Sequence, residues 1–190
     1  FSLPEPRLLG VTNMRALGDK TSRVMLGHVR GEWVAHPLSA DSTGSADGVI
    51  HKDKGGQVSP LGSLTDLKKN AIVAGCAPLL GVLSQRAGKR FRDAGVTWVP
   101  ASSERALDML SAGLVHVAGI HLFDELSERA NIDAVKSRFS GQKMIVAHLT
   151  RWRQGLIAAP GNPLGFSTLT DIVRDGVRFA QRAPGAGAAK

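Results

Sequence analysis

The chain has 190 residues, of which 43% are hydrophobic and 21% are charged, a composition typical of one globular domain or two small lobes. It contains no apolar run near the roughly 18 residues of a membrane span, so we expect no membrane partner. The net charge of +8 favours an anionic partner, either nucleic acid or a small oxyanion, and a solvated basic surface is the alternative. Because the basic residues are scattered, a nucleic-acid groove is not indicated.

The single cysteine, Cys76, excludes an internal disulfide and a cysteine-rich zinc site, and it fits a reducing compartment. The opening residues FSLPEPRLLG are too short and too polar for a secretion leader. We therefore expect a cytoplasmic protein and interpret the chain as a fragment or a processed piece.

Residues 1–70 predict a β-hairpin within a region that is otherwise a linker. Two β-rich runs, Val24 to Val29 and Trp33 to Ala35, flank Arg30-Gly31-Glu32, where Gly31 supplies a positive φ for the turn. Residues 49–60 carry too many Gly, Lys and Asp residues to predict an element. A short helix follows in residues 61–70, with Ser63 as its N-cap.

From Ala71 onward, strands alternate with helices of about a dozen residues, a pattern that indicates βαβ units and a parallel sheet. Pro78 suits a helix start, and Leu79, Leu80, Leu83 and Ala87 form the apolar stripe of that helix. The predicted strands cover residues 71–75, 96–100, 114–122, 143–151, 154–160 and 177–182. The predicted helices cover residues 78–91, 102–113 and 166–176.

Three stretches together resemble a known family. They read AGCAPLLGVLSQRAGKRF, VTWVPASSERALDMLSAGLVHVAGIHLFDE and RQGLIAAPGNPLGFSTLTDIVRDGVRFAQRAPGAG. This order is similar to the type II periplasmic-binding-protein-like (PBP-like) domain. More narrowly, it resembles the group with molybdate-binding, LysR substrate-binding and MoeA-like molybdopterin-biosynthesis names, whose members are fused behind a helix-turn-helix DNA-binding domain in bacterial transcription regulators.

The resemblance implies an α/β fold of the periplasmic-binding-protein-like II class, with a parallel-rich sheet flanked by helices. It implies two domains, an N-terminal β-hairpin and linker region over residues 1–70 and a PBP-like ligand-binding domain over residues 71–190. The family has two lobes, so the second lobe is expected to be truncated at Lys190.

Relatives that bind molybdate or tungstate hold the oxyanion by hydroxyls and backbone amides in two loops. The matching loops here read Gly75-Cys76-Ala77-Pro78 and Gly185-Ala186-Gly187-Ala188, with alanines where serine and threonine are expected. This departure weighs against a tight molybdate site, although the backbone amides of Leu79 and Leu80 at a helix start suit an anion.

In parallel sheets, ligands bind at the carboxyl ends of strands and at helix N-termini. Arg182, which ends the last predicted strand and opens a glycine-rich loop, is the first choice for a charged contact. The expected ligand-binding residues are Cys76, Ala77, Ser102, Ser103, His121, Arg182, Gly185 and Gly187.

Several of these residues have a second interpretation. Cys76 precedes a helix start and is either a nucleophile or, as we favour, a small buried loop cysteine, because no His or acid lies at a recognised spacing. Ser102 and Ser103 are helix caps as well as candidate contacts. His121 is a candidate hydrogen-bond partner for the ligand, and His116 is assigned to the core or to a subunit contact. Five residues apart, these two histidines would face opposite sides of a strand, so no metal site is expected.

Three further segments are weighed. Arg151-Trp152-Arg153 is either a cationic, aromatic rim or a solvated strand end. Asp124, Glu125 and Glu128 form an acidic turn that we interpret as solvated. Ala159-Pro160-Gly161-Asn162-Pro163 predicts a rigid corner that does not touch the ligand.

Together with these residues, the resemblance implies a non-catalytic domain without a cofactor that senses a small anionic ligand, such as a molybdate-like oxyanion, for a bacterial transcription regulator. DNA would be bound only through a separate helix-turn-helix domain, and ligand-driven lobe closure or rearrangement of a homodimer would transmit the signal. The alternatives are a solute receptor for oxyanion uptake, a domain associated with molybdopterin biosynthesis, and an oligomerisation module without a ligand.

Overall fold

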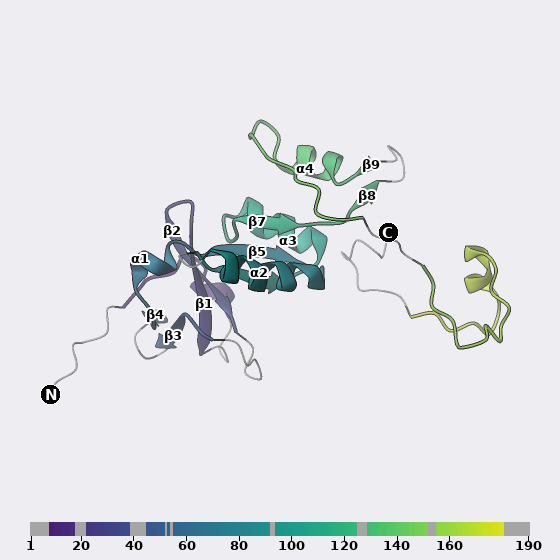
Figure 1. The fold of residues 1–190 in the computed structure, drawn as a ribbon, viewed down its shortest axis with the longest axis horizontal. Helices are drawn as coiled ribbons and strands as arrows, with labels where there is room; N and C mark the ends of the chain where they lie inside the picture. Colours follow the sequence, from purple (N-terminus) through teal and green to yellow (C-terminus); the bar gives the residue numbers. More distant parts are fainter. Residues whose placement is uncertain are drawn as a thin grey trace.

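A computed structural model describes residues 8–17, 22–38, 45–51, 53, 55–91, 94–124, 129–151 and 155–180. Two sheets lie beside each other, and residues 155–180 lie apart from both (Figure 1). A short 3-10 helix, η1 (Met14–Ala16), precedes the first strand. The first sheet is antiparallel, in the order β2-β1-β3-β4. Its strands are β1 (Arg23–Val29), β2 (Glu32–Pro37), β3 (Gly48–His51) and β4 (Gln57–Pro60).

The predicted hairpin is confirmed as β1 and β2. Its turn is the pair Arg30 and Gly31, with φ angles of 51° and 89°. Positive φ at both central residues matches the right-handed twist of the flanking strands. Arg30 also reaches the end of a later helix, where its guanidinium donates to the carbonyls of Leu110 and Ser111, both at 3.3 Å.

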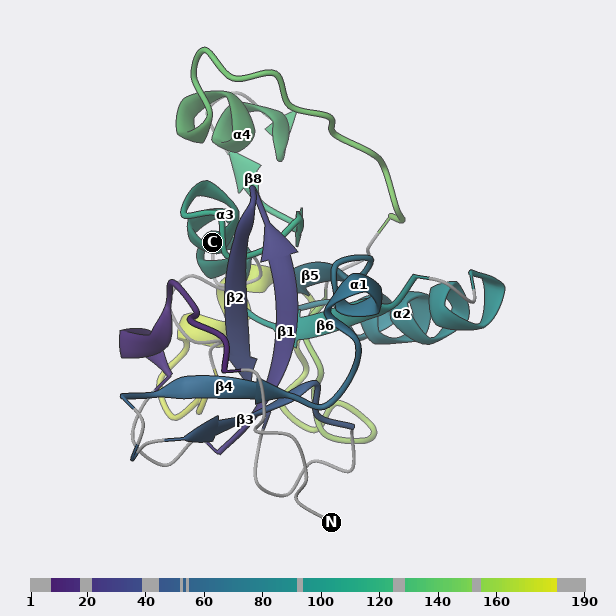
Figure 2. The same cartoon turned by 90° about the vertical axis from the view of Figure 1, so that its left-hand side faces the viewer.

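A second hairpin, β3 and β4, forms where no element was predicted. Its strands pair from Gly48 with Pro60 to His51 with Gln57. The glycines that argued against an element lie in the connection, since Gly55 and Gly56 have φ angles of 69° and 80°. Figure 2 shows this hairpin crossing the ends of β1 and β2.

The second sheet is the parallel sheet that the sequence predicts, in the order β6-β5-β7. Its strands are β5 (Ala71–Gly75), β6 (Val96–Pro100) and β7 (Val117–Gly119). Helix α2 (Pro78–Arg90) connects β5 to β6, and α3 (Ser103–Ser111) connects β6 to β7. Because β6 and β7 lie on opposite sides of β5, right-handed connections place the two helices on opposite faces. The fold is therefore α/β, with a parallel sheet flanked by helices.

The predicted apolar stripe of α2 is only partly correct. Leu80 and Ser84 are buried, whereas Leu79 and Leu83 are 43% and 42% exposed. The helix approaches β6 closely at Gly81, where an added Cβ would lie 2.9 Å from the Trp98 ring, so the buried face is centred away from Leu83.

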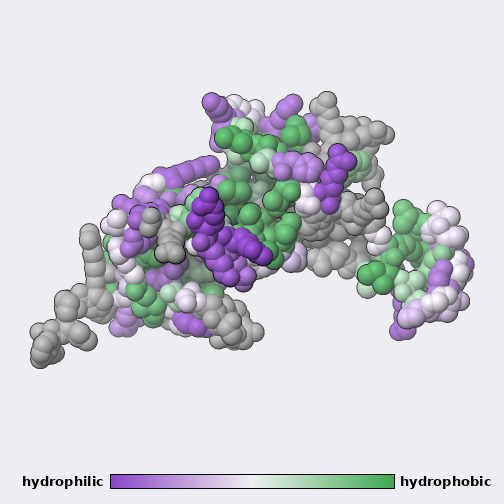
Figure 3. Space-filling view, viewed as in Figure 1, coloured by the Kyte–Doolittle hydropathy of each residue, from purple (hydrophilic) through white to green (hydrophobic). Residues whose placement is uncertain are grey.

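Figure 3 shows apolar side chains at the surface over the middle of the molecule, and again on residues 155–180.

Two core clusters anchor the sheets. The first lies within the N-terminal sheet around Leu26 and Val58, and it includes Leu67 of α1 (Leu64–Leu67), a helix whose N-cap is Ser63 as predicted. The second joins the two sheets, because Val29 and Val34 pack with residues of β5 and α3. Its other buried members are Ile72, Ala74, Ala106, Met109 and Val115.

A small cap follows β7. It consists of β8 (Phe123–Asp124), β9 (Arg129–Ala130) and α4 (Ile132–Arg138). Phe139, the C-cap of α4, packs with Leu107 and Leu122 in a third cluster. Glu125 and Glu128 of the expected acidic turn lie outside the described residues.

The predictions for the last third of the chain are wrong in large part. In the described residues of 143–180 no strand forms, and the predicted helix at 166–176 is reduced to the 3-10 helix η3 (Leu169–Val173). The backbone groups of a strand bond to a neighbouring strand, and among the residues that the structure describes no strand pairs with 143–151 or 155–160. Ile145 and Ile157 are accordingly 90% and 99% exposed.

The corner at Ala159 is built from local hydrogen bonds. The Asn162 amide donates to the Ala159 carbonyl at 2.9 Å, and the Asn162 side chain bonds both backbone groups of Phe166. After it, Asp171 accepts from the amides of Ser167 and Thr168, and these bonds lower the pKa of Asp171 to about 2. The chain turns as predicted, although no strand precedes the corner.

Candidate ligand site at the carboxyl edge

The carboxyl ends of the three parallel strands meet at one edge. Gly75, the last residue of β5, pairs with Pro100 of β6 and with Gly119 of β7. Helices α2 and α3 both begin at this edge, so their amide ends face the same region. The boundary between β5 and β7 is a topological switch point, because the connection from β5 runs to β6 on one side of β5, whereas the connection from β6 returns to β7 on the other side.

Two glycines let this edge close tightly. A Cβ added at Gly75 would lie 2.6 Å from the Gly119 carbonyl oxygen, and one added at Gly119 would lie 2.6 Å from Leu80 Cδ1. The Gly75 carbonyl also accepts from the Trp98 indole at 2.8 Å and from the Ala101 amide at 3.2 Å. These contacts fix the positions of the loops that follow β5 and β6.

The serines of the second loop hold different positions. Ser102 is the N-cap of α3, and its hydroxyl accepts from the Arg105 amide at 3.3 Å. Ser103 is fully buried, and its hydroxyl accepts from the His121 amide at 3.2 Å. Ser103 therefore ties the loop after β7 to the start of α3.

Cys76 and His121 are in direct contact. The Cys76 Sγ lies 2.8 Å from His121 Nε2, and this contact connects the loop after β5 to the loop after β7. Cys76 is half-buried. We favoured a small buried loop cysteine because no histidine lies at a recognised spacing in the sequence. Cys76 does lie in a loop, but it is half-buried, and His121, distant in sequence, is adjacent in space.

Ala77 lies beside Cys76 and is the N-cap of α2. It has an extended conformation and no side-chain capping hydrogen bond. The Leu80 amide, which we expected to face an anion, donates instead to the Ala77 carbonyl at 2.9 Å. Of the two amides singled out from the sequence, the one at Leu79 stays a candidate contact.

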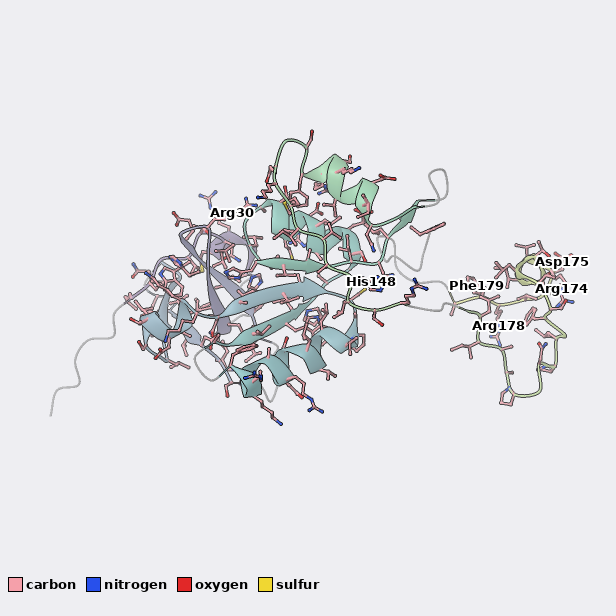
Figure 4. All side chains as sticks on the ribbon, turned by 45° about the horizontal axis from the view of Figure 1, so that its top comes forward. Arg30, His148, Arg174, Asp175, Arg178 and Phe179 are labelled. Atoms are coloured by element: carbon pink, nitrogen blue, oxygen red, sulfur yellow. The ribbon has the colours of Figure 1, made fainter. Side chains whose placement is uncertain are left out.

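The structure brings five of the predicted ligand residues to this edge. They are Cys76, Ala77, Ser102, Ser103 and His121. Arg182, Gly185 and Gly187 lie outside the described residues, as do Trp152 and Arg153 of the expected rim. Arg151 is described and exposed. Figure 4 places Arg174, Asp175, Arg178 and Phe179 on residues 155–180, away from the sheet.

His116 takes no part in the edge and lies just before β7. Its Nδ1 accepts from the Ile72 amide at 2.9 Å, and its Nε2 lies 3.2 Å from the His28 carbonyl. The described residues include no group of three or more His, Cys, Asp or Glu side chains that would hold a metal ion.

Both acidic side chains of α3 lie near one arginine of α4. Arg138 of α4 is ion-paired with Asp108 and lies 3.8 Å from the Glu104 carboxylate. A shallow pocket, lined by α4 and residues 139–146, is separate from the carboxyl edge. Among the helices that the structure describes, none is both long and apolar enough to cross a membrane.

Comparisons with known proteins agree with this architecture. The family model described as the PBP superfamily domain matches residues 84–190, which include β6, α3, β7 and His121. The uncharacterized protein YvgK of Bacillus subtilis is 23% identical over 123 residues, 65% of this chain. That match spans only 40% of the YvgK sequence. No solved structure matches the chain significantly. With the family match over more than half of its length, the chain belongs to the PBP superfamily.

Proposed function

We propose that the chain binds a small anionic ligand at the carboxyl edge of the parallel sheet, as the non-catalytic effector domain of a bacterial transcription regulator. In this proposal the protein is cytoplasmic and binds DNA only through a separate helix-turn-helix domain. Membership of the PBP superfamily supports a solute-binding role. The regulator context and the anionic ligand extend that role.

One observation carries the proposal: the starts of α2 and α3, the half-buried Cys76 and the His121 imidazole converge at the switch point. Helix N-termini present amide hydrogens and a partial positive charge, which together favour an anion. His121 adds a side chain that donates a hydrogen bond when protonated. A phosphate-sized or carboxylate ligand matches these donors better than a cation does.

The signal would follow from differential affinity. A ligand shifts a conformational equilibrium only as far as it binds one state more tightly than the other. Residues 139–151 follow α4 on the chain's way to residues 155–180 (Figure 1). Movement of this segment against the edge, or rearrangement of a homodimer, is the change that we propose for signalling.

A solute receptor for oxyanion uptake is the second candidate, because the same family match supports it. The gene on either side of this chain separates the two. A helix-turn-helix segment favours the regulator, and an export signal favours the receptor.

Ala77 offers a direct test of anion binding. Ala77→Ser and Ala77→Asp both supply the missing side-chain cap of α2, so each should stabilise the protein by roughly 0.5–1 kcal/mol. Only the aspartate places a negative charge beside the proposed ligand. Melting temperatures are to be measured with molybdate, tungstate, sulfate, phosphate and small carboxylates. A ligand at 100 times its dissociation constant adds about 2.7 kcal/mol.

We expect at least one anion to raise the melting temperature of the natural chain and of Ala77→Ser, and to leave Ala77→Asp unchanged. Equal shifts in both variants would place the anion elsewhere. No shift with any anion in the natural chain would contradict an anionic ligand.

A further inference from the structure

We propose that Cys76 and His121 form an activated thiol pair, and that Cys76 is the modification site of a thiol switch that forms mixed disulfides with small disulfides. The proposal rests on the geometry of the pair and not on the proposed function. It assigns a chemical reaction to an edge that the PBP superfamily match connects only with solute binding.

The geometry is that of a nucleophile beside its base. The Cys76 Sγ to His121 Nε2 distance of 2.8 Å is within hydrogen-bond range, so the proton can lie on either atom without loss of the contact. The bond survives proton transfer, because the thiol donates to the neutral ring and the imidazolium donates to the thiolate. The pair is thus arranged to hold a thiolate, the reactive form of cysteine.

Backbone contacts fix the positions of both Cys76 and His121. The backbone amide of His121 donates to Ser103 Oγ at 3.2 Å, and Ser103 is fully buried. On the other side, Gly75 packs against Gly119 and Leu80 so closely that a Cβ would collide with them. These contacts set the separation of the two loops and therefore the distance between sulfur and nitrogen.

The surroundings favour negative charge on the sulfur. Helix α2 begins at Pro78, two residues after Cys76, and helix N-termini stabilise a thiolate. Both acidic side chains of α3, those of Glu104 and Asp108, form ion pairs with Arg138 of α4. Cys76 is half-buried rather than fully buried, as a residue that meets a small reagent must be.

The reaction is a thiol–disulfide exchange. His121 Nε2 takes the thiol proton, and the Cys76 thiolate attacks one sulfur of a disulfide R–S–S–R. A bond forms between Sγ and that sulfur while the R–S–S–R bond breaks. The leaving thiolate takes the proton from the imidazolium and departs as RSH, so the small disulfide is the only oxidant required. A second thiol reverses the step.

A mixed disulfide would occupy the same edge as the proposed ligand. In that case the modified protein would no longer show the anion-dependent shift in melting temperature, and a reductant would restore it. This consequence, unlike the reactivity itself, rests on the proposed function.

The test is the rate of labelling of the full chain at pH 7 by iodoacetamide and by oxidised glutathione, followed by intact mass. An ordinary thiol is only a few per cent thiolate at this pH, so His121→Gln should react about tenfold more slowly than the natural chain. The rate of the variant should then rise more steeply between pH 7 and pH 9. His116→Gln, the same substitution on the same segment, is the matched control and should leave the rate unchanged.

A second measurement does not depend on any variant. The natural chain should react faster when folded than when unfolded in urea, although folding half-buries Cys76. Equal labelling rates for the natural chain and His121→Gln, or a folded rate no higher than the unfolded rate, would overturn the proposal. No ligand is present in the assay, so it can fail while anion binding survives, and the reverse also holds.

Discussion

His36 links the two sheets through a buried polar contact. Its Nε2 lies 2.7 Å from the Leu114 carbonyl oxygen, so the neutral ring donates a hydrogen bond to that oxygen. Leu114 directly precedes Val115 of the shared core. Only 3% of the residue is exposed. Burial lowers the pKa of His36 from its ordinary value of 6.5, and the hydrogen bond to Leu114 offsets part of that effect.

The lowered pKa makes stability depend on pH with a definite sign. Below pH 6.5 the unfolded chain takes up a proton at His36 before the folded chain does, so acidification favours unfolding. We expect the free energy of unfolding to fall between pH 6.5 and pH 5, by up to about 1.4 kcal/mol per pH unit. Denaturant titrations at each pH measure it.

His36→Gln is the comparison, because glutamine donates a hydrogen bond but has no proton to gain. The variant should show a shallower slope over the same range. Asp47 contributes with the opposite sign, since burial raises its pKa, but from an ordinary value of 3.8. Parallel slopes for the natural chain and His36→Gln would show that His36 does not cause the dependence.

At the residue scale, sequence reasoning placed the candidate residues but missed their contact. The rule that ligands lie at strand ends selected both Cys76 and His121. The pair itself has no local signature, because 45 residues separate its members and only the pairing of β5 with β7 brings them together. The same rule would have suggested the contact had the two adjacent strand ends been considered jointly.

The elements at the edge depend on close backbone approach. Gly75→Ala would place a methyl group 2.6 Å from the Gly119 carbonyl oxygen and from Leu80 Cδ1. The β5 and β7 backbones would have to separate, which we expect to cost about 1–3 kcal/mol of stability. The separation should also lengthen the contact between Cys76 and His121.

Gly88→Ala is the matched control, because this glycine lies within α2 and an added Cβ would have nothing within 4 Å. Alanine there should stabilise the protein by about 0.5–1 kcal/mol. Thermal unfolding of both variants measures the difference. A Gly75→Ala protein as stable as the natural chain would show that the edge is looser than described.

Elements with a complete local pattern could be predicted from the sequence. Helix α3 has a serine cap, and Gly113 with a φ of 69° follows its end; both features were read correctly. The segments 143–151 and 154–160 also have apolar sequences and were predicted as strands. Strand formation, however, depends on a neighbouring strand, which a local sequence pattern does not reveal. Exposed Ile145 and Ile157 show the consequence.

At the scale of the whole molecule, the N-terminal sheet supports the ligand edge. Val29 and Val34 pack against the face of β5 that also contacts α3, and Arg30 reaches the carbonyl end of α3. Such a contact suits the negative end of a helix dipole. The region predicted as a hairpin and linker is thus a four-stranded sheet that shares a core with the parallel sheet.

The location of the ligand is the central claim, and amide chemical shifts measured during an anion titration test it most directly. The anion used in the titration is the one that raises the melting temperature of the natural chain. The account predicts that the amides of Cys76, Leu79, Ser103 and His121 shift together and saturate with one affinity. Shifts confined to residues 155–180, or saturable binding that leaves these four amides unmoved, would contradict a ligand site at the carboxyl edge.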